Sequence, residues 1–306
     1  MEKHIPVLLN ETIELLNINP NGIYIDMTLG GGGHSEEILK RLDHGVLYGF
    51  DQDIYAIEKT KNRLSSYNNF YAINDNFKNA KKRLNDLDVE SVDGIVFDLG
   101  VSSFQFDIPE RGFSYRFDSP LDMRMDQSAS KTAYDVVNNY SFSDLVRIFF
   151  EYGEEKYSRQ IANRIVKTRE ESPINTTFDL VDIIKASIPT KELHKKGHPA
   201  KKVFQALRIE VNNELDILED SLNDSIELLK QGGRLAVITF HSLEDRICKR
   251  LFKKLSIIEI PKGLAIIVDE KPVIDLVNKK VVTADIDELS ENNRAHSAKL
   301  RVIIKN

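Results

Sequence analysis

Four consecutive glycines, Gly30 to Gly33, stand between an apolar run rich in β-formers and a helical segment, and this junction restricts the fold strongly. The apolar run covers residues 22–29, and the helical segment covers 35–42 with Ser35 as its expected N-cap. Glycines allow a sharp turn and a close approach to a ligand, and a following helix start offers N–H groups. The junction predicts a strand, a ligand-binding turn and a helix.

Strands continue to alternate with helices through the first hundred residues and again after residue 202. This alternation indicates βαβ units and a parallel sheet. The further strands are predicted at 46–50, 70–73, 92–97, 233–240 and 298–304, and the helices between them at 54–64 and 204–229.

The alternation breaks in the middle of the chain, where no strand-like pattern occurs. Amphipathic helices are predicted there at 142–152, 155–169 and 178–188. We therefore predict an α/β fold with two domains. One is a discontinuous domain formed by residues 1–108 and 203–306, and the other is an all-helical insertion at 109–202.

The composition indicates the cellular compartment. The single cysteine, Cys248, excludes an intrachain disulfide and suits a reducing cytosol. The N-terminus lacks the features of a signal peptide, and no apolar run approaches the ~18 residues that a membrane helix needs. We expect a cytoplasmic protein that does not associate with a membrane.

The net charge of −6 argues against a nucleic-acid partner, but the charge is unevenly distributed. Residues 109–202 carry 16 Lys and Arg against 14 Asp and Glu, whereas the remainder carries 26 against 34. The middle of the chain is therefore where a polyanion would be tolerated.

An acidic residue follows the glycine turn at a spacing in the sequence that is typical of nucleoside-binding sites. Asp51 ends the second strand 21 residues after Gly30, close to the ~20-residue offset of a carboxylate that binds ribose hydroxyls. A dinucleotide fingerprint would require glycine at position 35, where Ser35 stands. Ser35 at this position counts against NAD as the cofactor, and less against a cofactor without a pyrophosphate. A tight turn with a purely structural role remains an alternative.

Other strand ends add candidates for the same crevice. Asp98 follows a run too apolar for packing to explain the carboxylate, which favours a functional role. Phe77 follows the third strand and is either an adenine-stacking ring or a core residue. Gln105 reaches the same ligand or is a surface residue, and His34 contacts the cofactor, acts as a base or only closes the loop.

Two later segments have competing explanations. Ser242 and Asp245 match a capping box, which makes Ser242 a poor nucleophile, and the role of His241 is open. The lysine-rich segment 191–202 is either a solvated loop or a phosphate-contacting loop. Its histidines lack acidic or cysteine partners, so no metal site is predicted.

Taken together, these motifs resemble the bacterial 16S rRNA cytosine-N4 methyltransferase family, known as MraW or RsmH. The resemblance spans nearly the whole chain and rests on residues 4–11, 26–35, 98–103, 110–115, 121–126, 197–200, 204–208, 240–246 and 297–301. One departure is His296, where an arginine is expected.

The resemblance implies a class I fold that uses S-adenosylmethionine (SAM), with a Rossmann-like, mostly parallel twisted sheet and an inserted helical domain that helps recognise 16S rRNA, on the assembled small subunit. It leaves a monomer and a homodimer equally open. By position, the family's SAM contacts fall on Gly32, Gly33, His34, Asp51, Phe77, Asp98 and Gln105.

The expected reaction is direct in-line transfer of a methyl group to the N4 amine of a cytidine at the decoding centre, with Asp98 as the candidate proton acceptor. The base must be unpaired or flipped out. The candidates for stacking it are Phe104, Phe106, Phe113 and Tyr115. The alternatives are a methyltransferase acting on another RNA or amine, a non-catalytic SAM- or RNA-binding module, and an NAD-dependent dehydrogenase.

Overall fold

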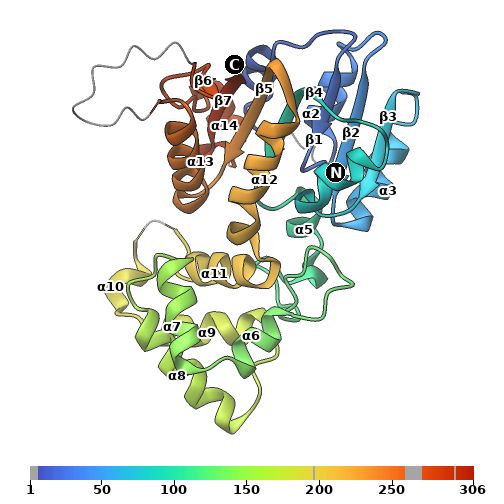
Figure 1. Cartoon of the computed structure of the whole chain (residues 1–306). Coiled ribbons are helices and arrows are strands. Elements are labelled where there is room, and N and C mark those ends of the chain that lie inside the picture. Colours follow the sequence, from blue (N-terminus) through green and yellow to red (C-terminus); the bar gives the residue numbers. More distant parts are fainter. Residues whose placement is uncertain (1–5, 196, 259–270, 293) are drawn as a thin grey trace, which may run out of the picture. The chain divides into compact units, whose positions relative to one another are not determined.

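The computed structural model describes residues 6–195, 197–258, 271–292 and 294–306 and divides the chain into two compact units (Figure 1). The α/β unit comprises residues 1–100 and 215–306, and the helical unit comprises residues 101–214. The division thus falls eight residues before and twelve residues after the predicted limits at 109 and 202.

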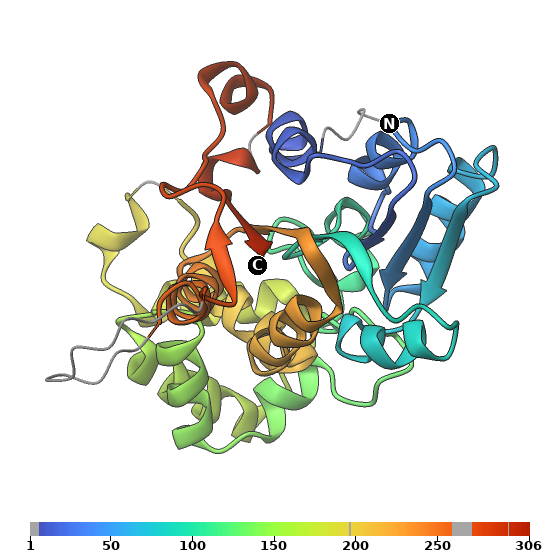
Figure 2. The same ribbon diagram turned by 45° about the horizontal axis from the view of Figure 1, so that its top comes forward.

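In the described residues, the α/β unit contains one seven-stranded sheet with the order β3-β2-β1-β4-β5-β7-β6 (Figures 1 and 2). Strands β1 to β5 are parallel, and β7 runs antiparallel to both of its neighbours, so the predicted mostly parallel sheet is confirmed. The strand β6 was not predicted, because three residues are too few to show alternation. The strands are β1 (Ile23–Asp26), β2 (Val46–Asp51), β3 (Phe70–Asn74), β4 (Val92–Asp98), β5 (Leu229–Thr239), β6 (Ile274–Leu276) and β7 (Lys299–Lys305).

Alternate residues of the strands bury their side chains on opposite faces of the sheet, as the two-residue period of a strand requires. Ile25 and Phe97 belong to one apolar cluster, whereas their neighbours Tyr24 and Val96 belong to another. Because both clusters are buried, helices must cover both faces, as in a doubly wound sheet.

The helices of the α/β unit divide between these two clusters. On the side of Ile25 and Phe97 pack α4 (Ala80–Asn85), α12 (Glu214–Leu228) and α13 (Ser242–Leu255). On the side of Tyr24 and Val96 pack α1 (Leu9–Leu16) and α2 (Gly33–Leu39). The remaining elements are α3 (Ile54–Arg63), α14 (Ile286–Glu291), η1 (Phe77–Asn79) and η3 (Ala295–Ser297). Cys248 is buried in the first cluster, as a core residue.

The helical unit, whose described residues contain no strand beyond an isolated bridge between Pro120 and Thr176, packs its helices around one apolar core. Ile148 of α7, Ile165 of α8 and Leu180 of α9 are fully buried in it. The elements are α5 (Ser103–Asp107), η2 (Pro109–Arg111), α6 (Ala133–Asn139), α7 (Phe142–Glu151), α8 (Ser158–Glu171), α9 (Thr177–Ser187), α10 (Thr190–Leu193) and α11 (Lys201–Asn212).

The prediction of one continuous helix over 204–229 is wrong. The chain forms α11 and α12 instead, separated by Asn213, which has a left-handed backbone with a φ of 54°. Asparagine tolerates this conformation better than most residues, so the break occurs without a glycine or proline to signal it. None of the described helices is both long and apolar enough to cross a bilayer.

Candidate functional site

Three carboxyl groups mark the carboxyl ends of neighbouring parallel strands. Asp26 ends β1, Asp51 ends β2 and Asp98 ends β4, and these strands are adjacent in the order β2-β1-β4. The order of the sheet reverses at β1, and ligands of open α/β sheets bind outside the strand ends at such a switch point. The candidate site is therefore built from these strand ends and the turns that follow them.

The carboxylate of Asp51 fixes the glycine turn by accepting hydrogen bonds from backbone N–H groups. Its Oδ2 atom accepts a hydrogen bond from the N–H of Gly30 at 2.8 Å, and its Oδ1 atom accepts one from the N–H of Asp53 at 2.9 Å. Burial raises the pKa of Asp51 to about 6, although these hydrogen bonds oppose the shift. A carboxylate has about four acceptor positions, so acceptor capacity remains for ribose hydroxyls.

The turn itself requires glycine on its packed side. Gly32 has a φ of 73°, and a Cβ atom there would lie 2.4 Å from Cγ2 of Thr60. A Cβ atom on Gly33 would lie 2.0 Å from Cγ of Pro6, whereas one on Gly31 would meet no atom within 4 Å. The turn therefore packs closely against α3 and Pro6 and is open at Gly31, where a ligand has room.

Ser35 does not cap α2, contrary to the prediction. Gly32 occupies the N-cap position without a side-chain cap, and Ser35 lies inside the helix. The Ser35 hydroxyl donates to Oδ2 of Asp26 at 2.7 Å, while Oδ1 of Asp26 accepts from the N–H of Thr28 at 3.1 Å. The tight glycine turn thus places the N-cap of α2 three residues before Ser35.

Asp26 is a site residue that the sequence analysis missed. It is 2% exposed, and burial raises its pKa to about 6. The signal that identified Asp98, a carboxylate after an apolar strand, was equally present at Asp26. The residue lies on the strand between those of Asp51 and Asp98, so it adds to the negative potential of the strand ends.

Asp98 carries the most unusual electrostatics of the described residues. Its Oδ1 atom is buried and has no hydrogen-bond partner among them, and its Oδ2 atom lies 3.6 Å from Nδ1 of the buried His34. Burial and the nearby carboxyl of Asp26 raise the pKa of Asp98 to about 8, with Arg294 acting in the opposite direction. A buried acceptor without a partner is costly, which indicates that a ligand supplies the missing donor.

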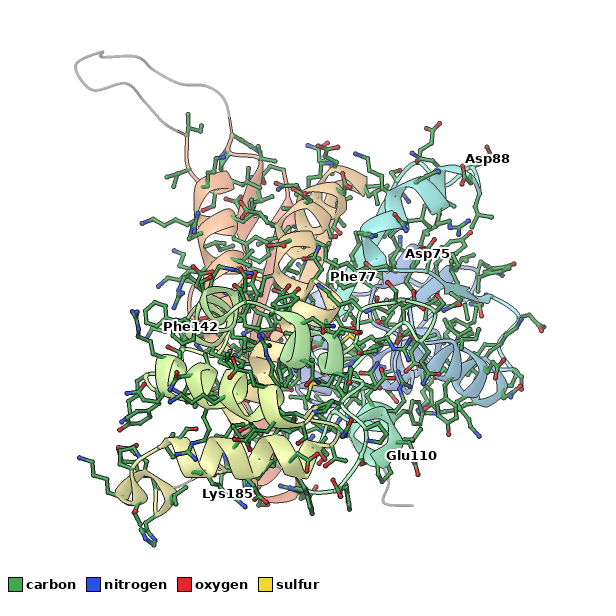
Figure 3. The ribbon with its side chains drawn as sticks, turned by 90° about the horizontal axis from the view of Figure 1, so that it is seen from below. Asp75, Phe77, Asp88, Glu110, Phe142 and Lys185 are labelled. Atoms are coloured by element: carbon green, nitrogen blue, oxygen red, sulfur yellow. The ribbon has the colours of Figure 1, made fainter. Side chains whose placement is uncertain are left out.

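Phe77 is brought to the same edge of the sheet by its neighbour Asn76. The Asn76 amide donates to Oε1 of Gln52 at 2.7 Å, and its Oδ1 atom accepts from the N–H of Lys78 at 3.0 Å at the start of η1. Because Gln52 directly follows Asp51, this side chain ties the end of β3 to the end of β2. Phe77 itself (Figure 3) is half-buried. Its ring meets that of Phe97 edge to face, with the centroids 5.5 Å apart.

The capping box predicted for Ser242 and Asp245 is wrong by one residue. His241 is the N-cap of α13, and Oε2 of Glu244 accepts from the N–H groups of Phe240 and His241 at 2.8 and 3.2 Å. Asp245 instead pairs with Lys299 and Arg301 of β7 at 2.9 and 2.8 Å. The open role of His241 thus includes a structural one at the end of β5.

Gln105 lies in the helical unit, where it is 4% exposed and its Oε1 atom accepts from the N–H of Ser102 at 3.0 Å in a capping box of α5. Its cofactor contact stays a prediction.

Among the candidates for base stacking, Phe113 is 5% exposed in the helical core and Phe106 is 36% exposed. Tyr115 stacks on His198.

A cavity of about 570 Å³ in the helical unit has a different character. Its lining includes Asp118, Asp122, Thr132 and Tyr134 and no lysine or arginine. Such a lining does not attract phosphate. In the described part of the chain, no group of three or more His, Cys, Asp or Glu side chains is arranged to hold a metal ion.

The doubly wound sheet, the strand order and the glycine turn opposite a strand-end carboxylate are those of a Rossmann-like protein that binds a nucleoside cofactor. The profile of the MraW methylase family matches residues 1–306, and the chain belongs to this family. This membership confirms the predicted family and SAM-dependent methyltransferase class and decides against an NAD-dependent dehydrogenase.

Similar proteins span the whole chain. Ribosomal RNA small subunit methyltransferase H of Streptococcus dysgalactiae subsp. equisimilis is 55% identical over 307 residues, which cover 99% of this chain and 97% of that protein. A solved rRNA methylase from Streptococcus thermophilus is 14% identical, with a TM-score of 0.43, and covers 100% of this chain and 98% of that one. TrmN from Thermus thermophilus is 12% identical, with a TM-score of 0.45, and covers 98% and 49% respectively.

Proposed function

We propose that this methyltransferase transfers a methyl group from SAM to the N4 amine of a cytidine in 16S rRNA, at the decoding centre of the small ribosomal subunit. The name of the 55% identical relative supports a target in small-subunit rRNA. The observation that carries the chemistry is the buried Oδ1 atom of Asp98, which lacks a partner among the described residues beside the glycine turn.

The residues at the strand ends fit SAM. The turn at Gly31 is open enough to admit the methionine part, and Asp51 has acceptor capacity for the ribose hydroxyls. Phe77 offers a half-buried ring at the end of β3 for the adenine. When bound, SAM supplies an electrophilic methyl group on a positively charged sulfur, a charge that the three strand-end carboxyls favour over the neutral thioether product.

Catalysis rests on position and on one proton acceptor. The N4 lone pair of cytosine is delocalised into the ring, so the enzyme must hold N4 in line with the methyl group and the sulfur. As N4 gains the methyl group it becomes cationic and must lose a proton, which the ionised Asp98 carboxylate accepts. A nearby positive charge lowers the pKa of Asp98 from its raised value and so prepares the carboxylate for this step.

The helical unit is the proposed RNA-recognition domain. It carries 17 Lys and Arg against 17 Asp and Glu, whereas the α/β unit carries 25 against 31. Phosphate binding depends on Lys and Arg, so the helical unit repels RNA less. The proposed substrate is the assembled small subunit in the cytoplasm, with the enzyme acting as a monomer or a homodimer.

The test is transfer of labelled methyl groups from SAM to small subunits that lack the modification, followed by mapping of the labelled nucleotide. We expect one labelled cytidine in 16S rRNA, modified at N4. Label at another nucleotide would show a different RNA target. SAM binding without any incorporation would show a non-catalytic binding module and overturn the proposal.

A further inference from the structure

An aromatic pair at the surface of the helical unit is held in a fixed geometry. The rings of Tyr115 and His198 stack with centroids 4.3 Å apart and planes 4° apart. Phe204 meets Tyr115 edge to face at 5.6 Å, and Nδ1 of His198 accepts from the N–H of Ala200 at 3.2 Å. Both residues of the stack are half-buried, so they form an ordered platform that a planar ligand can reach in part.

Two cations act on this pair. Burial, Lys185 and Arg116 lower the pKa of His198, which favours the neutral form of its imidazole. Arg116 is exposed, and Lys185 (Figure 3) is 47% exposed with only a loose pair to Asp182 at 3.8 Å. Such a surface pair contributes little, so the positive charge of Lys185 is available to a partner.

The local charge of the chain around the pair is strongly positive. Between residues 185 and 202 the sequence has six lysines and one acidic residue, Glu192. Glu192 already pairs with Lys156 and Lys195, each at 2.9 Å. The net positive potential beside the stacked rings is therefore intrinsic to this segment, although the helical unit as a whole is neutral.

Neutral aromatic faces beside cations are the combination that binds single-stranded nucleic acid, because bases stack on the rings and phosphates pair with the cations. We propose that Tyr115, His198, Arg116 and Lys185 form the surface through which the helical unit binds a single-stranded segment of ribosomal RNA. The proposal rests on the rRNA methyltransferase function proposed above. It also changes the expected role of Tyr115, since one face of its ring is already covered by His198.

The charged half of the surface is tested by neutralising it. In the full chain, the double variant Arg116→Gln and Lys185→Gln should bind unmodified small subunits about tenfold more weakly at 0.1 M salt. The slope of log Kd against log salt should become shallower by about 1.4, which is the value for two lost contacts to a single strand. The matched control neutralises two exposed cations of α8, with Arg164→Gln and Lys167→Gln, and should retain the wild-type affinity and slope.

The aromatic half is tested by removing one ring while keeping its hydrogen bond. His198→Asn leaves an acceptor for the N–H of Ala200 but removes the stack, and it should weaken binding about tenfold without changing the salt slope. Tyr115→Phe keeps the ring and should bind as the wild type does. Thermal unfolding of each variant establishes that the fold is retained.

The possible outcomes distinguish a failure of the surface assignment from a failure of the proposed rRNA function. If the wild type binds SAM but not the unmodified small subunits, the proposed rRNA function fails. If the wild type binds the subunits and the double variant and His198→Asn bind them equally well, the surface assignment is wrong and the function stands. Equal weakening by the α8 control would also overturn the surface, since binding would then follow total charge.

Discussion

Helix α2 beside the candidate site begins differently from three helices of the helical unit. In the α/β unit, α2 begins at Gly32 with no side-chain cap, at a turn that only glycine fits. In the helical unit, Thr132, Ser141 and Thr176 each accept an N–H at the start of α6, α7 and α9. Side chains thus satisfy the backbone at these three helix starts, whereas the start of α2 leaves backbone N–H groups and space for a ligand.

The acidic groups of the two units differ in the same sense. Burial raises the pKa of Asp26, Asp51 and Asp98 at the strand ends. In the helical unit, hydrogen bonds to Arg124 lower the pKa of Asp122 despite its partial burial. Groups held at a cost to stability are typical of functional sites. The raised pKa values at the strand ends therefore support the proposal that the chemistry takes place in the α/β unit.

The largest effect is expected from Asp98→Asn, which keeps the shape of the side chain and removes the proton acceptor. With saturating SAM, kcat for methylation of small subunits should fall about 100-fold or more. In the wild type, kcat/KM should rise with pH as the carboxyl ionises, with a midpoint below 8 because the positive charge of bound SAM lowers the pKa of Asp98, and the variant should lose this rise.

Asp93 supplies the matched control, because it lies at the other end of β4. Its carboxylate accepts from the N–H of Ile23 at 2.8 Å and pairs with Lys230 at 2.6 Å. Asp93→Asn should leave kcat within about twofold of the wild type, since it alters no group at the carboxyl ends of the strands, where the candidate site lies. Equal loss in both variants would mean that β4 is merely sensitive to substitution, and Asp98 would lose its assigned role.

The second prediction concerns stability against pH. With a folded pKa of about 8 and an unfolded pKa of about 3.9, Asp98 binds a proton in the folded state that the unfolded state lacks between these values. Its contribution is therefore complete below pH 4 and is lost as the pH rises to 8. Since the side chain is 26% exposed, we expect a loss of roughly 3 kcal/mol rather than the full linkage value.

Urea unfolding of the wild type and of Asp98→Asn at pH 5 and pH 8 isolates this contribution. The variant should gain stability relative to the wild type at pH 8 and less at pH 5. Asp26 and Asp51 act in the same direction between about pH 4 and 6, so they do not obscure the difference above pH 6. A difference that is constant with pH would contradict the raised pKa.

Two neighbouring glycines offer a third contrast, within the turn itself. Gly32→Ala places a Cβ atom against Thr60 in a left-handed backbone, and should lower the free energy of unfolding by about 2 kcal/mol or more. Gly31→Ala meets open space and should change it by less than about 1 kcal/mol. Urea titration measures both, and equal losses would show that the turn is not packed as described.

The success of the sequence analysis followed the length of each signal. Apolar runs such as the one ending in Asp98 identified the strands. The spacing from Gly30 to Asp51 predicted a carboxylate that binds ribose hydroxyls, which stays a prediction, but it did not show that Asp51 also accepts from the N–H of Gly30. Helix starts were less predictable, because Ser35 and Ser242 both had the right chemistry one or more residues away from the true cap. Local composition does not show which side chain the turn geometry places at the helix start.

Asn76 was also beyond the reach of sequence, because its partner Gln52 lies 24 residues away. Asn76→Ala should raise KM for SAM about fivefold with kcat within twofold, since it removes a hydrogen bond that positions Phe77 but contacts no reacting atom. The matched control is Asn69→Ala, which removes a 2.7 Å hydrogen bond to the carbonyl of Gly45 at the opposite end of β3. Raised KM in both variants would indicate a general loosening of β3.

The smallest expected effect is on stability, and it tests whether the helical unit and the cofactor site are independent. Thr176→Ala removes the side chain that accepts the N–H of Asp179 at the start of α9, and should cost about 1 kcal/mol of stability. KM for SAM should not change, because the cap serves only the helical unit. Ser172→Ala, at the exposed end of α8, is the control and should alter stability by less than about 0.5 kcal/mol. A changed KM for SAM in Thr176→Ala would show that the caps of the helical unit support the cofactor site, and the division of labour between the units would then be wrong.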